Sequence, residues 1–461
     1  MLFVEPLFLV FFAAIFIAYW SLPSLTARKT LLLIGSYVFY GAWDWRFLGL
    51  IAFSTLVDFC IGKRIADNTD KKKLYLIISL VSNLGLLGIF KYFNFFAQSA
   101  VDLAHVFGAT LNYTTLNIIL PVGISFYTFQ TLSYTIDIYR GKLKPQKSLL
   151  DFSLFVAFFP QLVAGPIVRA IDFLPQLETK RLWTNIPFKA CLLLFTIGFI
   201  KKTVISDNLA FTIDQVFSNP DSYTTLSIII GTLLYTVQIY CDFSGYTDMA
   251  IAVAGLLGFS LMKNFDAPYL ATSIIDFWRK WHISLSTWLR DYLYISLGGN
   301  RHGTIKRYRN LMLTMLLGGL WHGAAWTFVV WGILHGLALC INHLWHALKA
   351  PRLPNFLGWA ITFYLVSMAW IFFRAPDFAT AFTMAQSYMM IGTSGTQSLG
   401  AFYAFILIGL FATHFVWQKA NIAARIEALS STKFAIILGA TIPLILLLHP
   451  VGYRPFIYFQ F

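Results

Sequence analysis

His322 is the residue whose type and surroundings most directly suggest chemistry. It lies in Gly319–Gly323 (GLWHG), after the apolar run Leu311–Leu320, which is too short to cross a membrane alone. An imidazole can accept or deliver a proton near neutral pH, and glycine allows a bend or a close backbone approach. The pattern predicts either a general base or a histidine that packs helices together in a glycine-rich interface. The spacing alone does not decide between these two roles.

A second polar group lies in Tyr240–Asp248, in the middle of an apolar stretch. Polar and ionisable residues at membrane depth are costly and therefore suggest a function. Asp242, Ser244 and Tyr246 would belong to a polar pathway such as a proton or ion relay; the alternative is hydrogen bonding between helices. His335 would either support the site or bond to a neighbouring helix, and both interpretations stay open.

The composition indicates a membrane protein. Of 461 residues, 58% are hydrophobic and 12% are charged, and 34 Lys and Arg against 20 Asp and Glu leave a net charge of +14. Such a basic excess on an apolar chain belongs beside a membrane rather than on nucleic acid. The four cysteines are too widely spaced for a zinc site, and the common nucleotide-binding, zinc-protease and serine-hydrolase motifs do not occur. We therefore expect no metal site and no permanently bound cofactor.

The chain is expected to form one all-α membrane domain over residues 1–461. Each crossing needs about 20 mostly apolar residues, which predicts about 10–12 transmembrane helices together with re-entrant and interfacial ones. The candidate spans are Phe3–Leu22, Leu31–Trp45, Phe47–Gly62, Leu74–Phe96, Asn117–Ile138, Leu150–Val168, Ile186–Ile205, Thr225–Cys241, Phe243–Met262, Asn310–Trp345, Pro354–Phe373, Ala401–Trp417 and Phe434–His449.

Basic residues in short loops mark the cytoplasmic side of the membrane. They gather in Lys63–Lys73, Arg140–Lys147 and Lys263–Arg309, whereas Ser206–Thr224 and Ala375–Gly400 have none. This distribution predicts that both termini are extracytoplasmic. Regular alternation of the candidate spans fails in three intervals, so one candidate in each must turn back or cross twice. The breaks that would allow this are at Pro160 and Gly165-Pro166, at Asp242–Asp248, and at Gly318–Gly323.

The segment Ser273–Tyr294 differs from the spans. Its aromatic and aliphatic residues recur every three or four positions, and its charged and hydroxyl residues lie elsewhere around the helix. This pattern predicts a helix that lies in the plane of the membrane interface, with His282 by itself a surface residue. Packing on a soluble core is disfavoured because no soluble domain remains.

Several stretches taken together carry a family resemblance: Pro121–Gln130, Gln161–Ile167, Cys241–Tyr246, Phe277–Tyr292, Gly319–Gly323 and Phe456–Phe461. They resemble the membrane-bound O-acyltransferase (MBOAT) family. The similar branch is bacterial and contains the alginate and peptidoglycan O-acetylation proteins and, more distantly, the D-alanyl transfer protein of teichoic acids. The resemblance covers essentially the whole chain, with a motif-bearing core at about residues 117–345. Its most specific motifs are WRKWHISLSTWLRDY and GLWHG.

The resemblance implies a ring of tilted helices with a cytoplasmic funnel that reaches a central histidine, here His322. His282 matches a second functional position of the family. The resemblance also implies acetyl-CoA as the donor and a separate extracytoplasmic SGNH-type acetyltransferase as a partner. The final acceptor would be a cell-envelope polysaccharide, and the location would be the bacterial cytoplasmic (inner) membrane.

These implications give each candidate an expected role. His322 would be the base that deprotonates an acceptor hydroxyl, and Tyr458 would be an acyl relay or an interfacial tyrosine. The funnel would involve Trp321, Asp242, Ser244, Tyr246, Arg279, Lys280 and Arg290. The three basic residues would attract coenzyme A phosphates or anchor the protein to anionic lipid. Two alternatives remain: D-alanyl transfer from a carrier protein to teichoic acid, and a non-catalytic transporter of an activated donor.

Overall fold

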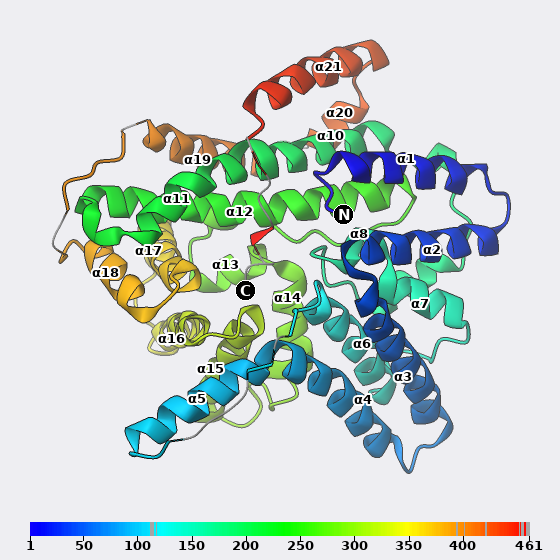
Figure 1. Cartoon of the computed structure of the whole chain (residues 1–461), viewed down its shortest axis with the longest axis horizontal. Coiled ribbons are helices and arrows are strands. Elements are labelled where there is room, and N and C mark those ends of the chain that lie inside the picture. The colour runs from blue at the N-terminus through cyan, green and yellow to red at the C-terminus, as the bar shows by residue number, and fades with distance from the viewer. Residues whose placement is uncertain are drawn as a thin grey trace. The chain divides into compact units, whose positions relative to one another are not determined.

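The computed structural model describes residues 1–110, 115–116, 118–392, 395–400, 402–419, 422–450, 452 and 456–457. All regular structure in these residues is helical, apart from an isolated bridge between Tyr223 and Gln397. The chain divides into two compact units, whose helices are labelled in Figure 1. Unit one comprises Met1–Ile186 and Val253–Met262, and unit two comprises Pro187–Ala252 and Lys263–Phe461. The predicted all-α fold class is confirmed, whereas the single-domain interpretation stays a prediction.

Unit one is a set of packed helices that buries a polar network. Its helices are α1 (Pro6–Ser21), α2 (Leu25–Asp44), α3 (Leu48–Asp67), α4 (Lys72–Leu87), α5 (Phe93–Val106), α6 (Ile124–Tyr139), α7 (Leu149–Ala157), α8 (Phe159–Leu162) and α9 (Ala170–Phe173). Helices α3, α4 and α6 pack on one another around Asp58. Ser79 Oγ donates to Asp58 Oδ1 at 2.6 Å, and Asn83 Nδ2 donates to Asp58 Oδ2 at 2.8 Å. These bonds satisfy the carboxylate away from water.

The predicted break near Pro160 is confirmed, because α7 ends at Ala157 and the short α8 is followed by irregular backbone. This broken segment packs against the start of α6, where Gly123 has φ 76° and a Cβ atom would lie 2.5 Å from the Leu162 carbonyl oxygen. Only glycine combines this backbone conformation with so close an approach.

The predicted first residues of two spans, Asn117 and Ala401, lie outside the described residues.

Unit two contains the longest helix and most of the sequence motifs. Its elements are α10 (Phe188–Phe199), the π-helical η5 (Ile200–Asp207), α11 (Asn208–Ser218), α12 (Thr225–Leu256, whose last residues belong to unit one), α13 (Ile274–Lys280), α14 (Ile283–Trp288), η8 (Leu289–Tyr294), α15 (Thr304–His322), α16 (Trp326–Ala347), α17 (Asn355–Arg374), α18 (Phe378–Tyr388), α19 (Tyr403–Lys419), α20 (Ile422–Glu427) and α21 (Ser431–Leu448). Because α10, η5 and α11 follow one another without interruption, the predicted loop Ser206–Thr224 is mostly helical.

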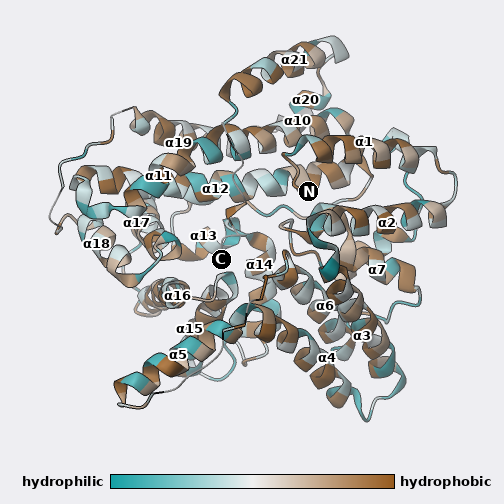
Figure 2. Cartoon of the chain, viewed as in Figure 1, coloured by the Kyte–Doolittle hydropathy of each residue, from teal (hydrophilic) through white to brown (hydrophobic). Residues whose placement is uncertain are grey.

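Six helical runs among the described residues are long and apolar enough to cross a membrane. They are Leu25–Asp67, Lys72–Val106, Thr225–Leu256, Trp326–Ala347, Asn355–Arg374 and Ser431–Leu448. Figure 2 shows hydrophobic residues along most of α21, as expected for a helix that meets lipid. The chain is therefore a multi-pass membrane protein. The total of about 10–12 crossings, the ring with its funnel, and the orientation of the termini stay predictions.

Helix α12 corrects the predicted interruption at Asp242–Asp248. It is continuous over 32 residues, which makes it about 48 Å long at about 1.5 Å per residue. Its acidic side chains bond to η5 and leave the backbone ladder intact: Lys201 Nζ lies 2.7 Å from Asp248 Oδ2, and Lys202 Nζ lies 2.7 Å from Asp242 Oδ1. One helix thus replaces two predicted spans. With a single span in this part of the chain, the predicted crossings there alternate regularly between the two sides of the membrane.

The predicted interfacial helix Ser273–Tyr294 is wrong in two respects. It is divided into α13 and α14 at His282, which is fully buried rather than on the surface and has a left-handed backbone (φ 42°, ψ 56°). The apolar side chains also pack inside the protein instead of facing lipid, because α13 lies against α16. The buried members of this face are Ile274, Trp281, Leu285, Trp288 and Tyr292.

A close helix crossing in unit two provides a test of the fold. A Cβ atom on Gly245 of α12 would lie 2.6 Å from the Gly198 carbonyl oxygen of α10. Overpacking costs about 1–3 kcal/mol, so Gly245→Ala should lower the melting temperature of the purified protein. Gly409→Ala in α19 is the matched control, because nothing lies within 4 Å of a Cβ atom there. Equal melting temperatures of the two variants would contradict the contact.

Candidate functional site

His322 is placed by a tight helical hairpin in unit two. It is the last residue of α15, and α16 begins at Trp326, so the break predicted at GLWHG is confirmed. The hairpin is tight because its glycines face backbone: a Cβ atom on Gly319 would collide with the Phe328 carbonyl oxygen. The glycines of the motif therefore pack the two helices, and this packing fixes where the histidine lies.

The imidazole of His322 is buried among aromatic rings. Its centre lies 5.0 Å from that of Trp331, 5.3 Å from that of Phe373 and 5.0 Å from that of Trp321. The C-terminal end of a helix carries a partial negative charge, which favours a cation beside it. His322 lies beside this partial charge at the end of α15, and the surrounding rings keep bulk water away from it.

His282 approaches the same place from the turn between α13 and α14. Its Nδ1 lies 3.2 Å from Asn264 Oδ1, and the Ser284 backbone N–H donates to that oxygen at 3.0 Å. Because a backbone N–H can only donate, the Asn264 atom is the amide oxygen, which can only accept. Nδ1 of His282 must then donate, and in the neutral ring Nε2 carries the lone pair. This Nε2 atom is buried and has no hydrogen-bond partner among the described residues.

The two imidazoles lie close together without bonding directly. Their ring centres are 6.4 Å apart, which is too far for a hydrogen bond between their nitrogens at about 3 Å. Trp321 lies against both, at 5.0 Å from His322 and 6.2 Å from His282. The structure therefore brings together three of the predicted site residues.

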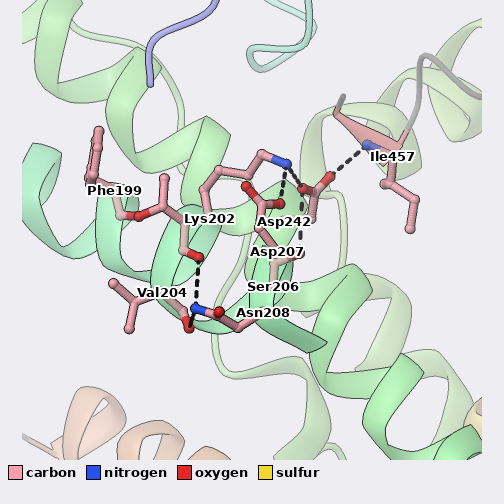
Figure 3. A network of polar contacts seen from close by, with 9 residues as sticks. Phe199, Lys202, Val204, Ser206, Asp207, Asn208, Asp242 and Ile457 are labelled. Atoms are coloured by element: carbon pink, nitrogen blue, oxygen red, sulfur yellow. Dashed lines mark hydrogen bonds and ion pairs between the residues drawn. The ribbon is translucent and has the colours of Figure 1, made fainter. Parts of the chain in front are cut away.

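Three other predicted residues lie on α12. Asp242 bonds to Lys202 and to the backbone N–H of Ile457 (Figure 3). Tyr246 lies 5.0 Å from the ring of Phe456, and Ser244 is buried. Asp242 and Tyr246 thus both contact the C-terminal segment Phe456–Ile457. Tyr458, the candidate relay, and the rest of the terminal motif after Ile457 lie outside the described residues.

The three residues predicted to bind phosphates differ in their exposure and in their ion pairs. Arg279 is exposed on α13. Lys280 Nζ is paired with Asp276 at 2.9 Å, and Arg290 Nε is paired with Asp291 at 2.6 Å. Their role at coenzyme A stays a prediction.

Sequence reasoning missed several residues that build the site. Asn264 lies 18 residues before His282, and no sequence pattern connects the two. Trp331 and Phe373 come from α16 and α17, where single aromatic residues are common. His335, by contrast, is one of the predicted candidates: its ring centre lies 4.7 Å from that of Trp331, and both of its nitrogens are buried without a hydrogen bond among the described residues. Nor do any three His, Cys, Asp or Glu side chains of the described chain gather where they could hold a metal ion.

Comparisons with known proteins agree with the motifs. The model of the MBOAT, membrane-bound O-acyltransferase family, matches residues 143–375, which include Asp242, His282 and His322. The probable alginate O-acetylase AlgI of Pseudomonas aeruginosa is 46% identical over 85% of this chain and 76% of its own length. AlgI of Pseudomonas putida is 40% identical over 100% of both chains. The peptidoglycan O-acetyltransferase of Helicobacter pylori is 38% identical over 86% of this chain and 81% of its own.

The buried His282 predicts a pH dependence of stability. Burial lowers the pKa of His282 from 6.5 to about 3. The unfolded chain therefore binds a proton before the folded protein does, and stability falls as the pH drops below about 6.5, by about 2 kcal/mol at pH 5. His282→Gln has no such group, so it should lose less stability between about pH 7.5 and pH 5 than the wild type, as measured by thermal unfolding in detergent.

The exposed His346 supplies the control for this experiment. His346→Gln should keep the pH dependence of the wild type. Equal losses of stability in the wild type and His282→Gln on acidification would show that His282 is not held neutral by burial.

Proposed function

Because the chain belongs to the membrane-bound O-acyltransferase family and is an O-acyltransferase, we propose that it moves an acetyl group from acetyl-CoA toward a hydroxyl of a cell-envelope polysaccharide. The alginate and peptidoglycan acetylating enzymes among its relatives suggest this class of acceptor. The observation that carries the proposal is the buried pair His322 and His282, with ring centres 6.4 Å apart. In the proposed reaction the acceptor hydroxyl approaches between these two rings.

The two histidines have different tasks in this reaction. His322 takes the proton of the acceptor hydroxyl while the oxygen attacks the thioester carbonyl carbon. The carbon–sulfur bond then breaks, and the coenzyme A thiolate leaves and receives the proton from the imidazolium. The hydrogen bond from Nδ1 of His282 to Asn264 Oδ1 fixes the neutral tautomer of this ring. Its fixed Nε2 lone pair instead accepts a hydrogen bond from a second donor group of a substrate.

The surroundings of the pair protect the thioester from hydrolysis. Trp331 and Phe373 pack against His322, and exclusion of water suppresses the competing reaction. Arg279 at the exposed side of α13, with Lys280 and Arg290, would attract the phosphates of coenzyme A on the cytoplasmic side. Asp242, Ser244 and Tyr246 would support the inner end of this path.

The family and the basic loops together suggest where the protein lies in the cell. The chain would lie in the bacterial cytoplasmic (inner) membrane with both termini outside the cytoplasm, as its basic loops indicate. The acetyl group would cross the membrane through the protein. A separate extracytoplasmic SGNH-type acetyltransferase would then complete delivery, because delivery to a polymer outside the membrane needs an acceptor-binding protein there.

The base assignment predicts the effect of one substitution. His322→Ala should lower acetyl transfer about 10²–10⁴-fold, the usual contribution of a general base. His346→Ala, on the exposed face of α16, should keep wild-type activity. The measurement is polysaccharide O-acetyl content in membranes that hold equal amounts of each protein. Unchanged acetylation in His322→Ala would exclude the proposed base.

The donor can be tested with the purified protein in detergent. Radiolabelled acetyl-CoA and a small hydroxyl acceptor should give labelled ester, and omission of the protein should abolish it. A transporter would produce no ester unless a second protein were added. Transfer from a D-alanyl carrier protein, with none from acetyl-CoA, would instead support the D-alanyl reaction.

A further inference from the structure

A buried cluster of charged side chains in unit two carries an excess negative charge and contacts the C-terminal segment. Lys202 Nζ lies 2.7 Å from Asp207 Oδ1 and 2.7 Å from Asp242 Oδ1, and all three side chains are at most 9% exposed. One ammonium group between two carboxylates leaves a formal charge of −1. A buried charge of this kind is costly unless further donors bond to it. The cluster therefore needs hydrogen-bond donors from elsewhere in the chain.

The C-terminal segment Phe456–Ile457 supplies one of these donors. The Ile457 backbone N–H donates to Asp242 Oδ2 at 2.9 Å, and Ser206 Oγ lies 3.5 Å from Asp242 Oδ1 (Figure 3). Hydrogen bonds to a charged acceptor are stronger than neutral ones. Asp242 thus fastens Phe456–Ile457 to α12.

A single aromatic side chain, Phe243, lies between this segment and His282. Phe456 is fully buried, and its ring centre lies 5.0 Å from that of Tyr246 and 5.9 Å from that of Phe243. The ring of Phe243 in turn lies 4.6 Å from that of His282. A continuous packed path therefore leads from the anchored segment to the second histidine.

We propose that Lys202 and Asp242 are positioning residues that hold Phe456–Ile457 behind His282, and that acyl transfer requires this docked segment. The activity part of this inference rests on the proposed function. Loss of docking leaves Asp242 without its backbone donor and removes Phe456 from Phe243. The ring of Phe243 then loses the support that keeps it against His282.

Docking can be measured without any enzymatic assay. Ile457→Cys is introduced into a chain in which Cys60 and Cys340 are replaced by Ser, and the rate of maleimide labelling is measured in detergent. In the otherwise unchanged protein the thiol should be protected, because Ile457 is 4% exposed. Asp242→Leu should accelerate labelling about 10–100-fold, the effect of losing a hydrogen bond to a charged group. Asp242→Asn retains an acceptor oxygen and should give an intermediate rate.

Asp248→Asn is the matched control. Asp248 pairs with Lys201 at 2.7 Å and joins the same two elements, η5 and α12. This substitution should leave the thiol at position 457 protected even if it lowers the melting temperature. The rates are compared only among variants that elute as monodisperse protein, and Asp242→Asn keeps the comparison available should Asp242→Leu fail to fold.

The activity arm uses the same variants with Ile457 intact. At saturating acetyl-CoA, kcat should fall in the order wild type, Asp242→Asn, Asp242→Leu, while Asp248→Asn stays near the wild type. A protected thiol in folded Asp242→Asn and Asp242→Leu would overturn the anchor. Faster labelling with unchanged kcat would overturn the requirement for docking. If the wild type transfers no acetyl group, the proposed function fails, and the labelling result still decides whether Asp242 holds the segment.

Discussion

The arrangement of unit two depends on the ion pairs that join η5 to α12. Lys201 and Lys202 extend from one helix to carboxylates of the other over 2.7 Å each. Helix α10, which continues directly into η5, approaches α12 closely where Gly198 and Gly245 have no side chains. Removing one partner of a buried pair costs about 3–5 kcal/mol, because the other charge is left uncompensated. These pairs neutralise the acidic side chains in the polar middle of α12, and the Lys202–Asp242 pair is the one that lies next to Phe243 and the site.

A second constraint acts on the backbone at the site itself. His282 has a left-handed conformation, which costs a non-glycine residue about 1–3 kcal/mol. The conformation is held by Asn264, whose amide oxygen accepts from the ring of His282 and from Ser284 at once. The same turn ends α13 and starts α14, so the position of the imidazole and the direction of both helices are fixed together. A strained residue fixed in this way, beside a second buried histidine, marks a functional site more specifically than either histidine alone.

The sequence predicted the features that depend on local backbone chemistry. Glycine and proline correctly marked the breaks after α7 and after His322, because these residues act on their own part of the chain. It failed where the outcome depends on a distant partner. Nothing near Asp242 shows that Lys202 neutralises it, so a polar string was interpreted as a break in the helix. The periodicity of Ser273–Tyr294 likewise revealed an apolar face without showing that protein rather than lipid covers it.

The backbone places the two histidines at opposite ends of helices. His322 ends α15, where carbonyl groups without helical partners favour a positive charge. His282 precedes α14, whose first two backbone N–H groups donate to Asn264, and burial lowers the pKa of this histidine. In the proposed reaction the proton of the acceptor hydroxyl goes to His322. The tight α15–α16 hairpin and the left-handed turn at His282 fix where the two imidazoles lie, so the same backbone features that shape the fold also position both candidate site residues.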